Sequence, residues 1–223
     1  MTLSGDIAAA MVDLDGTMVD TLGDFVAALD GALDELGLPP VSPAQVSQLV
    51  GKGGEHLVRG ALLASGLDAH SADALAADAL ERYRRHYDEV NGRYAKVYPG
   101  VAQGLQRLRD RGLRLACVTN KPTAPSRDLL RLMDLDRHFD VVAGGDRFER
   151  LKPDPMPLLH TCGELGTAPA RTLMIGDSLN DALAARAAGC PVVLVTYGYN
   201  HGRPVRDVDA DGYTDSLDTL AFA

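Results

Sequence analysis

The chain has 223 residues, a net charge of −9, and ordinary apolar (46%) and charged (24%) fractions. This composition is typical of a globular protein that is long enough to bury a full core. No apolar run reaches the roughly 20 residues of a membrane span, and the N-terminus lacks the pattern of a secretory signal. An acidic surface repels nucleic acid. We therefore expect neither a membrane nor a nucleic-acid partner.

The three cysteines, Cys117, Cys162 and Cys190, are an odd number and lie far apart in the sequence. This pattern argues against a disulfide framework and against a zinc site, and it indicates a reducing compartment. We expect a cytoplasmic protein. The sequence leaves both a monomer and a homodimer open.

The first predicted strand, residues 7–14, is followed by a long interval with helical patterning. Within residues 19–97 we predict helices at 25–36, 43–50, 55–65 and 72–87, separated by Gly- and Pro-containing breaks, and no strand. A lone strand before this interval needs later strands as partners. We therefore predict a core of residues 1–18 and 98–223, with a helical domain at 19–97 inserted after the first strand.

The remainder of the chain alternates between the two element types. Further strands are predicted at 113–119, 141–143, 172–175 and 192–195, with helices around 101–108, 129–133 and 179–187. Most of the strands are continuously apolar, as expected when both faces of a parallel sheet are covered. The prediction is an α/β fold with a Rossmann-like open parallel sheet.

Polar residues of catalytic type stand where these strands end. Ligands of open parallel sheets bind beyond the carboxyl ends of the strands, so we expect these residues to share one pocket. They are Asp13 and Asp15 in DLDGT, Thr119 and Asn120 in VTNK, Lys152 in LKPDP, and Asp177 and Asp181 in GDSLND.

These four segments resemble, in order, the four motifs of the haloacid dehalogenase superfamily, and the helical interval resembles the cap of one of its branches. The resemblance implies a phosphoryl-transfer enzyme that uses Mg²⁺. Asp13 suits a nucleophile that forms an aspartyl phosphate, and Asp15 suits a general acid and base. Thr119, Asn120 and Lys152 would hold the phosphoryl charge.

Mg²⁺ prefers a few carboxylates together with water and phosphate oxygens. The expected ligands are Asp13, the backbone carbonyl of Asp15, and Asp177, with Asp181 orienting a bound water. Asp181 could instead only favour the start of a helix through the helix dipole.

Two further segments bear on the substrate. VGKGG (50–54) and YGYNHG (197–202) resemble the phosphoglycolate phosphatases, which implies hydrolysis of 2-phosphoglycolate to glycolate and phosphate. We expect Gly51, Lys52 and Gly53 to meet the carboxylate of this small metabolite, although a Gly-rich segment could also be only a flexible loop. Another small ester (a sugar phosphate or a nucleotide), a phosphosugar mutase and a non-catalytic binding module stay open as alternatives.

Residues 207–218, DVDADGYTDSLD, follow the spacing of a calcium-binding loop. Their flanks differ from that motif, and a turn, a short strand at Tyr213 and a final helix near Ser216 also explain the stretch.

Overall fold

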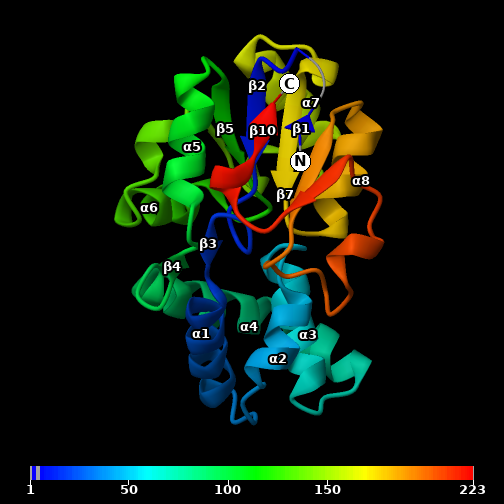
Figure 1. The fold of residues 1–223 in the computed structure, drawn as a ribbon. Helices are drawn as coiled ribbons and strands as arrows, with labels where there is room; N and C mark the ends of the chain where they lie inside the picture. The colour runs from blue at the N-terminus through cyan, green and yellow to red at the C-terminus, as the bar shows by residue number, and fades with distance from the viewer. Residues whose placement is uncertain (1, 4–5, 223) are drawn as a thin grey trace.

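A six-stranded sheet forms the centre of the computed structural model, which describes residues 2–3 and 6–222 (Figure 1). All neighbouring strands of this sheet are parallel. In sheet order they are β6 (Val141–Ala143), β5 (Arg114–Val118), β2 (Ala9–Val12), β7 (Thr172–Gly176), β8 (Val192–Val195) and β9 (Gly212–Thr214). The predicted open parallel sheet is confirmed.

Helices cover both faces of the sheet because successive strand residues point to opposite sides. Ala10 and Val12 pack with α5 (Val101–Asp110) and α6 (Thr123–Leu132). Ala9 and Met11 pack with α7 (Met156–Leu165) and α8 (Leu179–Ala188). The 3₁₀ helices are η1 (Asp136–His138), η2 (Gly145–Arg147), η3 (Pro169–Arg171), η4 (Val205–Asp207) and η5 (Leu217–Thr219).

Four helices pack on one another beyond one end of the sheet, in the lower half of Figure 1. They are α1 (Leu22–Glu35), α2 (Pro43–Leu49), α3 (Gly54–Ala64) and α4 (Ala69–Val90). The α2 helix begins with a capping box between Ser42 and Gln45, and the side chain of Asp68 accepts from Ser71 at the start of α4. We call α1–α4 the cap. Among the described residues, no helix is long and apolar enough to cross a membrane.

Two short strands connect the cap to the sheet. β3 (Val19–Asp20) and β4 (Lys96–Val97) form an antiparallel pair. The expectation that residues 19–97 contain no strand is therefore wrong at both ends of the interval. Each strand is only two residues long, so neither leaves an apolar pattern in the sequence, and each forms because the other pairs with it. The boundaries after residues 18 and 97 stay a prediction.

The C-terminal stretch differs from expectation in one element. The strand predicted at Tyr213 is β9, but the helix expected near Ser216 is only the 3₁₀ turn η5. It leads to β10 (Ala221–Phe222), which pairs in parallel with β1 (Thr2–Leu3). Within 207–218, Asp209 and Asp211 form ion pairs with Arg186 at 3.0 and 2.8 Å.

Candidate active site

The predicted site residues gather at the carboxyl ends of the strands. Asp13 follows β2, Thr119 follows β5 and Asp177 follows β7, so the parallel arrangement brings them to one edge of the sheet. A cavity of about 490 Å³ lies between this edge and the cap. Asp13, Asp15, Thr119 and Asn120 line it on the sheet side, and residues 50–57 line it on the cap side. The site therefore combines residues from both layers.

Six charged side chains at this edge of the sheet are at least nine-tenths buried. Four are carboxylates and two are ammonium groups, so together they carry a net charge of −2: Asp13, Asp15, Asp177, Asp181, Lys121 and Lys152. Burying unbalanced charge costs free energy, because the charged groups lose their hydration. One divalent cation would balance this cluster.

Lys152 connects the nucleophile candidate to the strand edge. Its Nζ lies 3.0 Å from Asp13 Oδ1 and 2.7 Å from Asp181 Oδ1, and it donates to the carbonyl of Val118 at 2.8 Å. Burial alone would lower the pKa of Lys152, but the two carboxylates outweigh burial and raise this pKa. Lys152 is therefore a fixed positive charge against Asp13.

The carboxyl groups of Asp13 and Asp177 have too little positive charge around them to offset the cost of burial. Burial raises the pKa of Asp13 to about 7, with Lys152 opposing the rise and Asp181 adding to it. Burial, followed by the charges of Asp181 and Asp13, raises the pKa of Asp177 well above its usual range. Such shifts are typical of acids that need a cation to stay ionised together.

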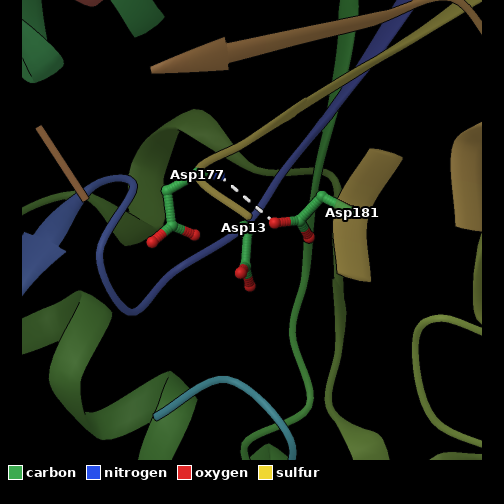
Figure 2. A group of neighbouring side chains, drawn as sticks. All are labelled: Asp13, Asp177 and Asp181. Carbon is green, nitrogen blue, oxygen red and sulfur yellow. Dashed lines mark hydrogen bonds between the residues drawn. The ribbon is translucent and has the colours of Figure 1, made fainter. Parts of the chain in front are cut away.

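Figure 2 shows Asp13, Asp177 and Asp181 around one small space. One carboxylate oxygen of each lies within 4.8 Å of the other two. Asp181 is held by the backbone N–H groups of Asp177 and Ser178, both at 3.2 Å. The side chain of Asp15 instead lies 3.4 Å from Lys121. Hard carboxylate oxygens around a cluster of net charge −2 fit Mg²⁺.

The loop of residues 197–202, YGYNHG, lies behind Asp177 and does not line the cavity. The backbone N–H of Tyr199 donates to Asp177 Oδ2, and Thr17 Oγ1 donates to Asp177 Oδ1 at 3.3 Å. Gly198 packs so closely that an added Cβ would lie 2.4 Å from the carbonyl oxygen of Gly16. The loop thus fixes the orientation of Asp177.

Asn120 holds the backbone on both sides of the cavity. Its Oδ1 accepts from the N–H of Lys152 at 2.9 Å, and its Nδ2 donates to the carbonyls of Lys152 (2.8 Å) and Gly51 (2.9 Å). Both amide N–H groups are therefore engaged with the protein itself. Thr119 differs, because its hydroxyl accepts from the backbone of Lys121 at 3.2 Å and keeps its own proton for a ligand.

The Gly-rich cap loop meets the sheet layer through Gly51. The carbonyl of Gly51 accepts from Asn120 and also from Asn180 Nδ2 at 3.1 Å. His201 Nδ1 lies 3.3 Å from the carbonyl of Gln48 in the same part of the cap. The two segments VGKGG and YGYNHG are therefore neighbours in space. The Lys52 side chain lines the cavity and is exposed.

Lys121 was missed as a site residue, although it is the last residue of VTNK. Only 7% of it is exposed, its Nζ lies 3.4 Å from Asp15 Oδ1, and it donates to the hydroxyl of Tyr87. The same atom lies 4.9 and 4.2 Å from the ring centroids of Phe25 and Tyr87. Its position in the motif was the available signal. The helical pattern of the cap gave no signal that the rings of Phe25 and Tyr87 would contact Lys121.

Comparison with known proteins assigns the class. The model of the haloacid dehalogenase-like hydrolase family matches residues 10–195, and the chain belongs to this family. Together with its relatives, this membership makes the chain a phosphoric monoester hydrolase. The resemblance of the four motifs is confirmed.

Named relatives match nearly the whole chain. Phosphoglycolate phosphatase of Thiobacillus denitrificans is 44% identical over 97% of this chain and 95% of the relative. The enzyme of the same name from Nitrosospira multiformis is 45% identical over 95% and 92%. Among solved structures, a predicted phosphoglycolate phosphatase from Haemophilus somnus aligns with a TM-score of 0.86, at 31% identity over 96% of each chain.

Proposed function

We propose that this protein hydrolyses 2-phosphoglycolate to glycolate and phosphate, with Mg²⁺ as cofactor and Asp13 as nucleophile. The observation that carries the proposal is the buried cluster of four carboxylates and two ammonium groups at the floor of a 490 Å³ cavity. The names of the relatives support the choice of ester. A cytoplasmic location stays a prediction.

In the first step we assign the bond changes to Asp13 and Asp15. A carboxylate oxygen of Asp13 attacks phosphorus, the bond from phosphorus to the ester oxygen breaks, and Asp15 gives a proton to the departing oxygen. The phosphoryl group is then carried as an aspartyl phosphate. The contact between Lys152 and Asp13 supports this role, because it fixes the attacking carboxylate.

In the second step Asp15 removes a proton from water, and the water oxygen attacks phosphorus. The bond to Asp13 breaks, phosphate leaves and the carboxylate is restored. Asp15 thus acts as acid and then as base, and the protons balance over the two steps.

Phosphoryl oxygens need donors that are not already engaged. We assign this role to the Thr119 hydroxyl and to the backbone N–H of Asn120. Lys152, whose ammonium already contacts Asp13, Asp181 and the Val118 carbonyl, would add the attraction of its positive charge. Among the described residues the N–H of Asn120 has no acceptor, whereas its side-chain amide is engaged on three sides. The phosphate contact that we predicted for Asn120 is therefore proposed for its backbone.

Bound Mg²⁺ supplies positive charge that keeps the carboxylates ionised and stabilises charge on the phosphoryl oxygens. We propose that Asp13, Asp177 and the backbone carbonyl of Asp15 hold it. Following the resemblance, we keep Asp181 outside the direct ligands, where it accepts from Lys152 and Ser178 and could orient a bound water.

Residues 19–97 are proposed to act as a lid that admits small esters and excludes bulk water. Gly51, Lys52 and Gly53 line the cap side of the cavity. We propose that they face the end of the substrate that carries the carboxylate. The exposed ammonium of Lys52 would attract an anionic ester to the cavity.

The test is a panel of small phosphomonoesters assayed with chelated protein and again after Mg²⁺ is restored. We expect 2-phosphoglycolate to give the highest kcat/KM and activity to return only with the metal. Asp13→Asn should lower kcat at least a thousandfold, because an amide is a poor nucleophile.

Other outcomes point to the alternatives. A preference for hexose phosphates or nucleotides would show that the substrate is one of these esters and not 2-phosphoglycolate. A requirement for a bisphosphate activator would indicate a mutase. Full activity of Asp13→Asn, with deamidation excluded by mass spectrometry, would remove the mechanism.

A further inference from the structure

Lys121 is the most completely buried cation at the cavity that the proposed chemistry does not use. It follows β5 on the sheet side, yet it contacts the cap through Tyr87 and Phe25. The two rings lie stacked with their centroids 5.6 Å apart. Aromatic faces attract an ammonium group, so they hold Nζ in place beside Asp15.

The ammonium group retains donor capacity for a ligand. A lysine has three N–H donors. Within the described part of the chain, the hydrogen-bond acceptors of the Lys121 ammonium are Tyr87 and Asp15. Lys121, Tyr87, Phe25 and Asp15 all line the cavity. One N–H of an ammonium at the cavity wall therefore remains for a ligand.

The position of Lys121 beside Asp15 determines which part of the substrate the Lys121 ammonium can reach. Asp15 is assigned to the ester oxygen, and Nζ lies 3.4 Å from its carboxylate. In 2-phosphoglycolate a single methylene separates the ester oxygen from the carboxylate carbon. A group that contacts Asp15 is thus placed beside the carboxylate of the leaving group rather than beside phosphorus.

We propose that Lys121 is the specificity-determining residue of this phosphatase, and that its ammonium binds the carboxylate of the leaving group. The inference rests on the proposed function and deepens it. Lys52 and Arg84 also line the cavity, but both are exposed, so water and salt screen their charges. Lys121 acts in a nearly dry setting, where a charge-assisted hydrogen bond discriminates more strongly.

The experiment compares 2-phosphoglycolate with 2-hydroxyethyl phosphate, in which a neutral hydroxymethyl group replaces the carboxylate. Lys121→Met keeps most of the length of the side chain and removes its charge. We expect kcat/KM for 2-phosphoglycolate to fall about 10- to 100-fold, mainly through KM, and to fall less than about fivefold for the neutral ester. Each variant is compared with wild type on the same ester, so intrinsic reactivity cancels.

Lys96→Met is the matched control, because it makes the same substitution at an exposed lysine that does not line the cavity. It should change kcat/KM for 2-phosphoglycolate less than about threefold. Lys121→Gln is a second uncharged variant in case the Met variant does not fold, which circular dichroism checks.

Two results overturn the inference. An equal loss of kcat/KM on both esters would mean that Lys121 supports Asp15 or cap closure and does not recognise the carboxylate. An unchanged preference for 2-phosphoglycolate over the neutral ester would mean that Lys121 has no role in recognition. Failure of wild type to prefer 2-phosphoglycolate would instead overturn the proposed function.

Discussion

Gly198 lies where the loop of residues 197–202 packs against both Gly16 and Asp177. A methyl group there would lie 2.3 Å from Asp177 Cβ and 2.4 Å from the carbonyl oxygen of Gly16. Neither neighbour is the free end of a flexible side chain, so a larger residue must displace the loop. The loop carries the N–H of Tyr199 that orients Asp177, and displacement therefore reaches the proposed metal site.

We predict that Gly198→Ala raises the Mg²⁺ concentration for half-maximal activity at least tenfold and lowers the free energy of unfolding by about 1–3 kcal/mol. Magnesium titrations of activity and urea unfolding measure the two effects. Gly163→Ala in α7 is the control, because an added Cβ meets nothing within 4 Å and alanine favours a helix. Equal magnesium requirements in the two variants would contradict the prediction.

Single residues also show where sequence reasoning stops. The identity of Lys152 and its motif predicted a place near phosphate, and the structure puts its ammonium against Asp13. Lys121 stands in the same set of motifs, but no pattern indicates that its side chain turns toward Asp15 and two cap rings. Contacts between layers depend on how the cap sits on the sheet, and periodicity along one segment does not encode that.

At the scale of elements, the contact of Asn180 with Gly51 joins α8 to the cap. Asn180 is buried and does not line the cavity, and its Nδ2 donates to the Gly51 carbonyl at 3.1 Å. Such a bond contributes about 1 kcal/mol, which corresponds to roughly a fivefold change in the ratio of closed to open cap. We therefore predict that Asn180→Ala raises KM about 3- to 10-fold and changes kcat less than about twofold.

Steady-state kinetics tests this prediction, with Ser42→Ala as the matched control. Ser42 loses hydrogen bonds of similar strength within the capping box of α2, but it does not join the two layers. The control should lower stability by about 1 kcal/mol and leave KM unchanged. A rise in KM in both variants would trace the effect to cap stability rather than to the contact with Gly51.

Elements with long, regular patterns were predictable from the sequence. The five strands and four cap helices that we predicted are present, with ends shifted by at most three residues. The pattern was less informative within α8. Leu183 of this helix is 47% exposed, while the helix buries small residues such as Ala182 and Ala185 against the sheet. Close helix–sheet packing favours alanine, so the largest apolar residue was a poor guide.

At the scale of the whole molecule, the net charge of −2 in the buried cluster links metal binding to pH. The pKa of Asp13 without metal is about 7, above its usual value of 3.8. The folded chain therefore binds more protons than the unfolded chain between these values, and Asp13 makes folding less favourable as the pH rises from 3.8 toward 7. A cation that binds the ionised carboxylate removes this cost.

We predict that Mg²⁺ raises Tm, and that its binding releases more protons at pH 6 than at pH 8, because burial raises the pKa of Asp13 to about 7 and that of Asp177 well above its usual range. Calorimetry in buffers of different ionisation enthalpy measures the number of protons. Asp13→Asn should reduce this dependence on pH, and the Asp177 carboxyl, whose pKa is also raised, accounts for what remains. Equal proton release by wild type at both pH values would contradict the assignment of Asp13 as a ligand.

The central strand β2 pairs with β5, about a hundred residues later, and with β7, which lies later still. During synthesis β2 leaves the ribosome well before either partner strand is made. Helices α1–α4 follow β2 directly, and their buried apolar residues pack mostly on one another. We expect the cap to fold before the sheet. Until its partners are made, β2 is an unpaired apolar strand that is prone to wrong pairing. We expect slow folding to follow from placing the proposed nucleophile directly after a strand whose partners come about a hundred residues later.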